Sequence, residues 1–502
     1  MAHANDTLAD WQAMLLDRLA RDPQIDLVGR MEGQGLARRS QIDVFLRAFL
    51  AVERLIVARQ ILPYDTLGAR AVLSELPVTE NAAAADIVLE FGERKLTAEQ
   101  MADQDQGVWS LTFGGGLDAT NVATGVTQRT APGMIVQIVQ RSAEVPEGHV
   151  VRAAQYHLKP GAILTGAFVE EKSVLLVLRA LHDLAAGQTA CAGSKPPLSA
   201  PQPQTVFGEI GYAASFVTAL AAKLRDRWQA RKGRAPDFWR LAVGSGDVVN
   251  LETRTATALP ALSHTMADPF LFENDGKIWV FYEAMNADDG NGWIDVAELD
   301  GDTLKPAATA LSCPYHLSFP FVFRDKDDIY MLPETQQSRR LEVWRAVEFP
   351  AKWERHATAF EGKYLADSTL WKAQDGQWWL LTNLSDHHSF QDHSSELYLF
   401  AVDGPELGSI TPHPKNPVVI GSDIARNAGA LIRENGRLFR PSQNNSYCYG
   451  YGLNLMEITT LDAVEFEETM VRRWTPDDRP NTLGIHHLST SGDRFVFDWS
   501  GK

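Results

Sequence analysis

The sequence predicts a chain of several domains, in which an N-terminal α/β domain precedes a five-bladed β-propeller. Its 502 residues are too many for one ordinary hydrophobic core. The first part alternates between apolar-periodic helices and short strands, which favours an α/β sheet. The second part repeats one pattern five times: a polar residue, an apolar strand, a turn with Gly or Asp, and a second strand rich in aromatic residues. We therefore predict domains at 1–186 and 235–502, joined by a linker at 187–205 and a helix at 206–234.

Hydrophobic periodicity predicts the elements of the N-terminal domain. Leucines and tryptophan at helical spacing predict the first helix, and alternating apolar residues predict the strands. The expected helices cover about 8–20, 41–58, 97–103 and 170–186, and the expected strands cover 25–29, 85–92, 107–114, 134–140 and 148–156.

The segment that follows is rich in Pro, Ala, Gly and Ser and reads as a linker. The long helix after it ends in the basic residues Lys223, Arg225, Arg227, Arg231 and Lys232. We expect these residues to form a solvated face on a helix packed between domains. An anchor for an anionic lipid or a nucleotide-sugar is the alternative.

The five repeats begin with polar residues that recur after 50, 49, 60 and 60 positions. A repeat of roughly 40–50 residues made of short strands is typical of a propeller. The same position of every innermost strand faces the central funnel, so we expect these side chains to meet at one mouth. Polar strand starts above a packed core fit a binding site. The five residues are Asp268, Ser318, Asp367, Asn427 and His487.

Composition excludes several other classes of protein. Lys and Arg number 47 against 64 Asp and Glu, a formal charge of −17, which argues against a nucleic-acid surface. The three cysteines, Cys191, Cys313 and Cys448, are scattered and predict neither a disulfide framework nor a metal site. No signal peptide and no membrane-spanning run of apolar residues is evident. We therefore expect a cytoplasmic protein, for which peripheral membrane contact stays open.

Ten ordered motifs in the C-terminal half carry a family resemblance. Among them are Trp279-Val-Phe-Tyr-Glu, Asp367-Ser-Thr-Leu-Trp and Phe439-Arg-Pro-Ser-Gln-Asn. Over about 235–500 they resemble the N-terminal propeller domain of glucosamine inositolphosphorylceramide transferases and its bacterial relatives. The resemblance implies a carbohydrate-active protein that makes or tailors a cell-surface glycan or glycolipid. In the plant members the transferase is a separate domain after the propeller, so its activity is not carried over.

That propeller is in turn similar to five-bladed glycosidases that cleave arabinans and xylosides. Those enzymes place an Asp base on the first blade, a second Asp on the third and a Glu acid on the fourth. Asp268 and Asp367 match the first two, whereas the fourth-blade position here reads Arg426-Asn427-Ala428-Gly429. Since hydrolysis needs a proton donor and a carboxylate that activates water, the acid role falls to Glu334 or Glu283, or is absent. His487 stands where such glycosidases often hold a cation, which implies a divalent cation there.

The candidate catalytic residues are thus Asp268, Asp367 and Glu334. The candidate substrate-binding residues are Ser318, Arg426, Asn427, Arg440, Gln443, His487 and Glu283.

Several of these candidates have an alternative role. Arg426 could hold a phosphate or carboxylate through two parallel hydrogen bonds, or pair with Asp367 or Asp423. Its small neighbours, Ala428 and Gly429, suggest room for a ligand.

Three further segments are ambiguous. Of the adjacent His486 and His487, only one is expected to face the funnel, since neighbours in a strand point to opposite faces. Residues 386–393 suit a solvated loop better than a metal site. Residues 444–451 offer amide and aromatic groups that could bond and stack on a sugar, or form an ordinary turn.

The N-terminal region more faintly resembles the Rossmann-like formyltransferase fold of methionyl-tRNA and sugar-amine formyltransferases, through the order of its strands and closing helix. Those enzymes use an Asn-x-His after the central strand and an Asp in a later turn. Here the two places read Trp109-Ser110-Leu111 and Val145-Pro146-Glu147-Gly148. We therefore expect a catalytically silent relative that serves structure, docking or nucleotide binding.

Three functions follow as hypotheses. The first is glycosyl transfer or hydrolysis, with a sugar, glycan or nucleotide-sugar bound in the propeller funnel. The second is a non-catalytic sugar-binding or assembly subunit. The third is formyl or acyl transfer to an amino sugar.

Overall fold

The computed structural model describes the chain in two compact units. The first unit holds residues 1–221 together with 387–391, and the second holds 222–386 and 392–502. The described residues are 8–31, 44–79, 85–91, 96–97, 100, 107–114, 132–142, 144–188, 196–198, 206–230, 239–286, 291–385 and 387–501.

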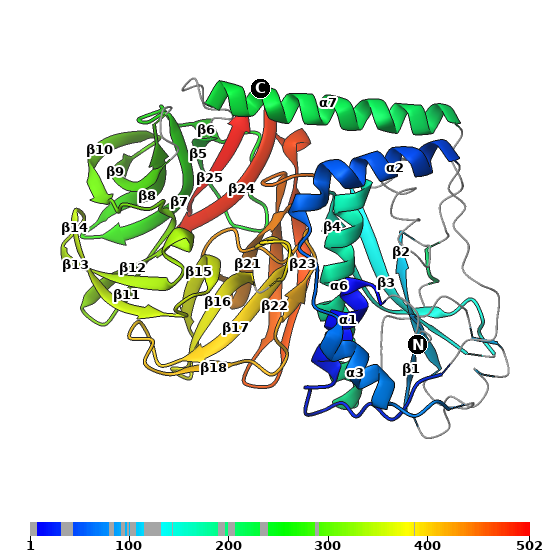
Figure 1. The fold of residues 1–502 in the computed structure, drawn as a ribbon. Coiled ribbons are helices and arrows are strands. Elements are labelled where there is room, and N and C mark those ends of the chain that lie inside the picture. Colours follow the sequence, from blue (N-terminus) through cyan, green and yellow to red (C-terminus); the bar gives the residue numbers. More distant parts are fainter. Residues whose placement is uncertain are drawn as a thin grey trace. The chain divides into compact units, whose positions relative to one another are not determined.

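The first unit combines helices with one mixed sheet of order β1-β2-β3-β4 (Figure 1). β1 pairs with β2 in parallel, while β2–β3 and β3–β4 are antiparallel. The Rossmann-like arrangement therefore gains no support from the described strands. The elements are α1 (Asp10–Leu19), α2 (Val44–Val57), η1 (Ala58–Gln60), α3 (Leu67–Glu75), β1 (Val88–Leu89), β2 (Val108–Phe113), β3 (Gly133–Arg141), β4 (His149–His157), α6 (Ala162–Ala185) and α7 (Val206–Ala230).

Most predicted helices and strands of this unit are present, with three differences. The segment 25–29 forms no strand and leaves only a bridge between Arg30 and Val78. α3 was not expected, but its Ala69 and Leu73 pack against α1 in a small core. α6 begins at Ala162 rather than near residue 170. Most of the helix expected at 97–103 lies outside the described residues.

The second unit is a five-bladed β-propeller, as predicted, with five sheets around a common centre (Figure 1). First strands of neighbouring blades lie against each other, as β7 does with β11 and β24. The first blade consists of β7 (Thr265–Asn274), β8 (Lys277–Met285), β9 (Gly292–Asp300) and β10 (Thr303–Leu311), and the second of β11 (Ser318–Asp325), β12 (Asp328–Glu334), β13 (Leu341–Glu348) and β14 (Lys352–Ala359). The third blade consists of β15 (Tyr364–Lys372), β16 (Trp378–Ser385), β17 (Glu396–Val402), β18 (Ile410–Pro412) and β19 (Val419–Ile420). The fourth blade consists of β20 (Ile432–Glu434), β21 (Arg437–Asn444), β22 (Gly452–Leu461) and β23 (Phe466–Trp474). Short 3₁₀ turns lie at Gln336–Ser338 and Pro476–Asp478.

The fifth blade joins the two ends of the propeller. Its order is β24 (Thr482–Ser491), β25 (Arg494–Gly501), β5 (Trp239–Ser245) and β6 (Thr257–Ala258). β25 and β5 pair antiparallel, with Val496 opposite Val243. The fifth blade thus combines β5 and β6, from the start of the propeller sequence, with β24 and β25 from its end, and this pairing closes the ring of blades.

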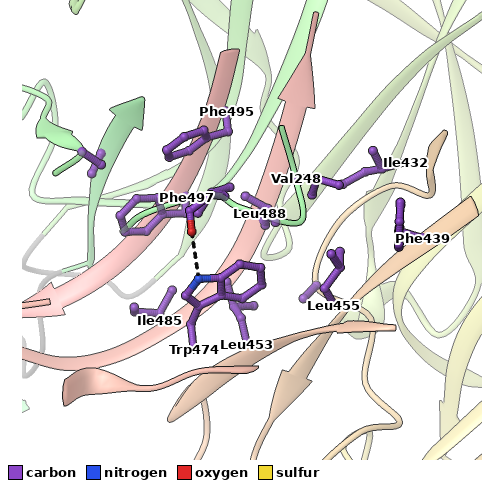
Figure 2. Close-up of a cluster of buried hydrophobic side chains, with 14 residues drawn as sticks. Val248, Ile432, Phe439, Leu453, Leu455, Trp474, Ile485, Leu488, Phe495 and Phe497 are labelled. Atoms are coloured by element: carbon purple, nitrogen blue, oxygen red, sulfur yellow. Dashed lines mark hydrogen bonds between the residues drawn. The ribbon is translucent and has the colours of Figure 1, made fainter. Parts of the chain in front are cut away.

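Apolar side chains fill the space between blades. In the cluster of Figure 2, Phe495 and Phe497 of the fifth blade meet Leu455 and Trp474 of the fourth, all buried. The Trp474 indole donates a hydrogen bond to the Leu251 carbonyl, at 3.3 Å, so its polar atom is satisfied inside the core. This packing fixes the blades that position the candidate site.

A bulge recurs at the funnel end of the first strands. The pairing register shifts between Ala267 and Phe270, and Asp268 has φ of 48°. The second and third blades shift at the matching place, where Phe319 and Asp367 have φ of 46° and 47°. A bulge adds one residue to a strand and re-aims its side chains. The bulge carries the aspartates into the centre.

The bulge also corrects the predicted register by one residue in two blades. Phe319, rather than Ser318, is the counterpart of Asp268. In the fifth blade the shift lies between Ile485 and Leu488, so His486 takes that position and His487 follows it.

Candidate functional site

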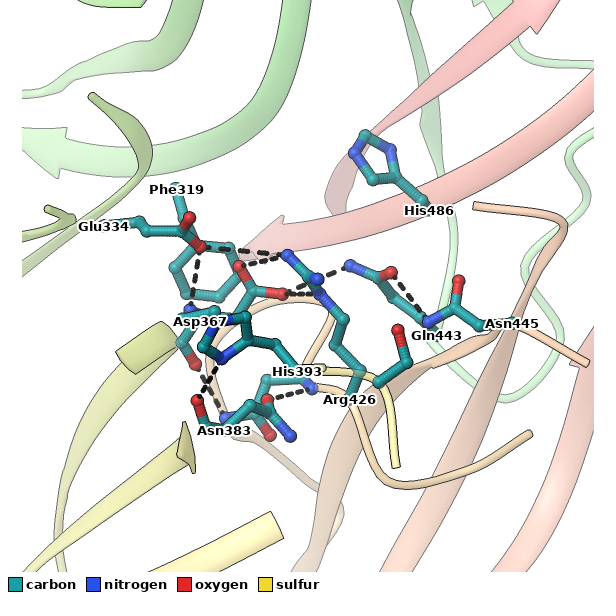
Figure 3. A network of polar contacts seen from close by, with 12 residues as sticks. Phe319, Glu334, Asp367, Asn383, His393, Arg426, Gln443, Asn445 and His486 are labelled. Carbon is teal, nitrogen blue, oxygen red and sulfur yellow. Dashed lines mark hydrogen bonds and ion pairs between the residues drawn. The ribbon is translucent and has the colours of Figure 1, made fainter. Parts of the chain in front are cut away.

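Asp367 and Arg426 form the centre of a polar network at the funnel end of the blades (Figure 3). The guanidinium donates from Nε to Oδ2 of Asp367 at 2.6 Å and from Nη2 to Oδ1 at 3.3 Å. Gln443 of β21 donates a further hydrogen bond to Oδ2 at 3.2 Å. Asp367 is buried, so these three donors replace the water that its charge loses. Of the two partners proposed for Arg426, the structure shows Asp367.

Glu334 ends β12 beside this pair. Its Oε2 lies 3.8 Å from Nη2 of Arg426 and accepts a hydrogen bond from the Asp367 backbone N–H at 3.3 Å. Burial and the neighbouring Asp367 carboxylate raise the pKa of Glu334 well above its usual value, against the opposing effect of Arg426. A carboxyl held in its protonated form can donate a hydrogen bond or a proton. Glu334 therefore has the property expected of an acid group.

Asp268 belongs to a second group with His486 and Asp498. Nε2 of His486 lies 3.4 Å from Oδ1 of Asp268, and Nδ1 lies 2.8 Å from Oδ2 of Asp498. Asp498 also accepts hydrogen bonds from the backbone N–H groups of Asp268, His486 and His487. One imidazole thus links two buried carboxylates.

The electrostatics of this group favour charged forms. The two carboxylates outweigh burial and raise the pKa of His486 to about 9. Despite its burial, the neighbouring imidazole of His487 and the charge of His486 lower the pKa of Asp268 to about 2. Asp268 is therefore ionised but weakly basic.

Both histidines lie at Asp268, whereas the sequence predicted that only one would face the funnel. Nδ1 of His487 lies 3.5 Å from Oδ1 of Asp268, and its ring packs edge-on against Phe270 and Phe319. The alternation rule fails here because the bulge of β24 interrupts the pleat.

Glu283, Ser318 and Asn427 surround the two groups. Glu283 lies 3.2 Å from Nε2 of His316, and burial raises its pKa. Ser318 is buried opposite Glu334 in the β11–β12 pair. Asn427 donates from Nδ2 to the Asp367 carbonyl at 2.8 Å.

Arg440 lies away from solvent, with a fully buried side chain. Its guanidinium contacts both carboxylate oxygens of Glu468, at 2.8 and 2.5 Å, and the Ile424 carbonyl at 2.9 Å. It also donates to Oδ1 of Asn427 at 3.3 Å. This places Arg440 behind the site, where it positions Asn427.

Ala428 and Gly429 do not provide room for a ligand. The Leu488 N–H donates to the Ala428 carbonyl at 2.8 Å, which joins the fourth and fifth blades. A Cβ on Gly429 would lie 2.0 Å from the Leu488 carbonyl oxygen, and the residue has φ of 144°. The small residues are thus explained by the close approach of two backbones.

The stretch 444–451 brings amide and aromatic groups to the site. Asn445 donates to Oε1 of Gln443 at 3.2 Å and accepts from the Gly450 N–H at 2.7 Å. The Tyr449 ring lies 5.0 Å from the Arg426 guanidinium, and 53% of the residue is exposed. Tyr447 is similarly exposed at 56% but packs against Tyr451 with tilted rings. Tyr449 is therefore the exposed aromatic surface beside Arg426.

Sequence reasoning missed Asp498 and His316. Asp498 follows Phe495-Val-Phe in the last repeat, where an acid inside an apolar strand was the available signal, whereas no sequence pattern marks His316. His393 ends the segment 386–393, for which a solvated loop was the favoured prediction, but its side chain is buried between Asn383 and Gln336. Burial lowers its pKa to about 4, so it is neutral.

Among the described residues, Asp268, His486 and Asp498 could together hold a metal ion, since one donor atom from each lies within 4.8 Å of the others. The cation predicted near His487 would therefore be bound by Asp268, His486 and Asp498 rather than by His487 itself. Both imidazole nitrogens of His486 already face carboxylates, so a proton satisfies the same geometry. Of the other proposed metal cluster, Asp386 lies outside the described residues. His387 and His388 belong to the first unit, where His388 N–H contacts Glu171.

Comparison with known proteins identifies a related family. Residues 245–481 match the family model described as glucosamine inositolphosphorylceramide transferase 1, N-terminal. The transferases of that name from Arabidopsis thaliana and from Oryza sativa subsp. japonica are each 34% identical, over 267 and 250 residues, or 52% and 48% of this chain. The chain spans about a third of the length of these curated relatives, 33% in each case. The predicted resemblance of the propeller is confirmed, whereas neither a bacterial origin nor the formyltransferase-like domain gains support.

The chain is also similar, at low identity, to solved structures of glycosidases. A thermostable family-43 glycoside hydrolase is 13% identical and covers 47% of this chain and 87% of its own, with a TM-score of 0.35. Native Bacillus subtilis arabinanase Arb43A is 12% identical and covers 47% and 95%, with a TM-score of 0.34. At this level of similarity they carry no conclusion about activity.

Proposed function

We propose that the protein is carbohydrate-active in the synthesis or tailoring of a glycolipid or cell-surface glycan, and that its propeller binds a sugar at the Arg426 network. The observation that carries the proposal is the meeting of three kinds of group. They are a carboxyl with a raised pKa at Glu334, an ion-paired guanidinium at Arg426, and the exposed ring of Tyr449. The printed names of the relatives, which contain a sugar and a sphingolipid, support the same class of substrate.

Each group has a distinct part in this proposal. The Tyr449 ring offers an apolar face on which a sugar ring can stack. Arg426 and Gln443 offer donors to hydroxyl or phosphate oxygens beside the ring. Glu334, as a neutral carboxyl, protonates or hydrogen-bonds the glycosidic oxygen. In these roles the network is a site for binding a glycoside and polarising its leaving group.

The state of the other carboxylates bears on the reaction. Asp268 accepts a hydrogen bond from the Phe319 N–H at 3.1 Å and faces both imidazoles, so it is a weak base for activating water. Asp367 is engaged by Arg426 and Gln443. Because both aspartates are engaged by neighbouring groups, we favour glycosyl transfer or sugar binding over a hydrolysis that requires two free carboxylates. They also make a non-catalytic sugar-binding subunit the second candidate.

The test is sugar binding by the full chain, measured by isothermal titration calorimetry with a panel of monosaccharides and nucleotide-sugars. We expect Tyr449→Ala to weaken binding at least tenfold, on the order of one stacking contact. Tyr447→Ala is the matched control, because Tyr447 is equally exposed in the same turn but packs against Tyr451. Equal affinity of the Tyr449 variant and wild type would remove this site from the proposal.

Turnover separates the two candidates. The protein is incubated with activated sugars and glycolipid or glycan acceptors, and products are followed by mass spectrometry. A product that depends on Glu334, and is lost in Glu334→Gln while sugar binding persists, supports the enzyme. Binding without any Glu334-dependent product supports the binding subunit.

A further inference from the structure

Helix α2 of the first unit is apolar on nearly all sides. One face, with Leu46, Leu50 and Val57, is buried. Large apolar side chains nevertheless remain exposed on the rest of the helix. They are Val44 at 84%, Phe45 at 42%, Val52 at 53%, Leu55 at 81% and Ile56 at 48%. A surface helix is ordinarily polar toward water, and a continuous exposed apolar patch marks an interaction surface.

Helix α7 extends this apolar surface. It packs on α2 through Phe49, whose ring meets Tyr212 at 5.7 Å and Phe216 at 5.8 Å (Figure 1). In the part of α7 that belongs to the first unit, two exposed apolar side chains lie seven residues apart and therefore share one side of the helix. They are Ile210 at 49% and Val217 at 57%.

The charges on these helices are segregated by sign. The described exposed charged residues of α2, η1 and residues 206–221 of α7 are Arg47, Arg54 and Arg59, all cationic. The acids Glu53 and Glu209 are buried, and Glu53 accepts hydrogen bonds from Tyr212 and from the Ile163 N–H at the start of α6. The chain as a whole carries −17. A cationic apolar face on an acidic protein calls for an anionic apolar partner.

We propose that α2, η1 and residues 206–221 of α7 form a face that lies on the surface of an anionic lipid bilayer. Such a surface supplies both partners: apolar side chains enter the boundary between headgroups and acyl chains, and arginines reach lipid phosphates. A second copy that used the same face would bring arginines against arginines, which opposes self-association. In the described part of the chain no helix is long and apolar enough to cross a membrane. The helices thus lie on the bilayer, and this inference does not rest on the proposed sugar site.

The test is flotation of the full-length protein with lipid vesicles. One set is phosphatidylcholine alone, and the other contains roughly 30 mol% phosphatidylglycerol. We expect binding to the anionic vesicles that weakens in high salt. We expect at least a tenfold lower partition coefficient for Val52→Glu with Leu55→Glu, and a smaller loss for Arg54→Glu with Arg59→Glu.

The matched control is Val347→Glu with Val464→Glu, which changes two equally exposed valines of the propeller, at 64% and 62%. It should float like wild type. Circular dichroism of each variant verifies folding. The proposal is overturned by absence of wild-type flotation, by flotation of Val52→Glu with Leu55→Glu at the wild-type level, or by a dimer in sedimentation that this variant abolishes.

Discussion

Arg426 and Asp367 meet through two hydrogen bonds, although 59 residues separate them. Asp367 lies in the third blade and Arg426 immediately before the fourth, so their fork-like contact ties two blades together at the funnel. The resemblance to glycosidases implies a catalytic carboxylate at Asp367, and an ion pair with Arg426 was the alternative. The structure instead shows a neutralised pair, which is why the proposed chemistry centres on Glu334.

The first prediction concerns Arg426. Replacement by Met leaves the Asp367 carboxylate buried with one remaining side-chain donor. Breaking a buried ion pair typically costs about 3–5 kcal/mol, so we expect a lower free energy of unfolding in urea by that order. Arg437→Met is the control, because the Arg437–Glu457 pair is exposed and worth about 1 kcal/mol or less. Equal losses for the two variants would contradict a special role for the buried pair.

The second prediction concerns Glu334. A carboxyl whose pKa is raised on folding destabilises the folded state increasingly as pH climbs above the pKa of the unfolded chain, because folding must then take up a proton or bury a charge. Glu334→Gln removes this penalty. We therefore expect the variant to gain stability relative to wild type between acidic and neutral pH, measured by urea unfolding at several pH values.

The control for that experiment is Glu354→Gln, which alters an exposed residue paired with Arg345. It should show no pH-dependent gain. A Glu334→Gln variant whose stability difference is constant with pH is the outcome against the raised pKa.

The third prediction concerns His486. Its pKa of about 9 exceeds the ordinary 6.5, so its stabilising contribution is complete below pH 6.5 and is lost as pH rises through 9. One proton gives a slope of at most about 1.4 kcal/mol per pH unit in this window. We expect His486→Asn to be less stable at pH 6.5 and to have a flatter profile up to pH 9.

At acidic pH the stability of the fold changes with pH in the opposite direction. The pKa of Asp268 is lowered to about 2, so its contribution is present above its ordinary 3.8 and is lost as pH falls toward 2. Wild type should therefore lose stability at both ends. An unchanged alkaline slope in His486→Asn would assign that slope to another group.

The fourth prediction concerns Gly429. A methyl group there would meet the Leu488 carbonyl oxygen, so Gly429→Ala must push two blades apart. Overpacking of this kind typically costs about 1–3 kcal/mol. Gly301→Ala is the control, because Gly301 also has positive φ, 60°, but has open space around it. The difference between the two melting temperatures isolates the clash, and no difference would mean that the blades yield freely.

The repeat predicted most of the propeller, because each blade must place a strand at the same distance from the axis. It located Asp268 and Asp367 at equivalent positions, and both have φ near 47°. It misplaced Ser318 by one residue, because a bulge inserts a residue without changing the apolar pattern of the strand. It also read Gly429 as empty space, since sequence does not show which backbone lies opposite a glycine.

The first unit was predicted less completely because packing between elements decides its structure. α3 carries a glycine, Gly68, near its start, which lowers helix propensity, yet Ala69 and Leu73 find partners in α1. The segment 25–29 alternates like a strand, but Val28 remains 51% exposed and none of the described strands pairs with it. Asp498 escaped notice for a similar reason, since its partners come from residues 230 and 12 positions away.

The pairing of β5 with β25 has a consequence for biosynthesis. Val243 of β5 can pair with Val496 of β25 only after Val496 has been synthesised. The ring of blades therefore stays open until nearly the whole propeller has left the ribosome. Until then the β5 edge is unpaired, and such edges invite wrong partners. Contacts of such sequence separation also form slowly. A nascent chain of this protein is therefore most exposed to aggregation in the interval just before β25 is made.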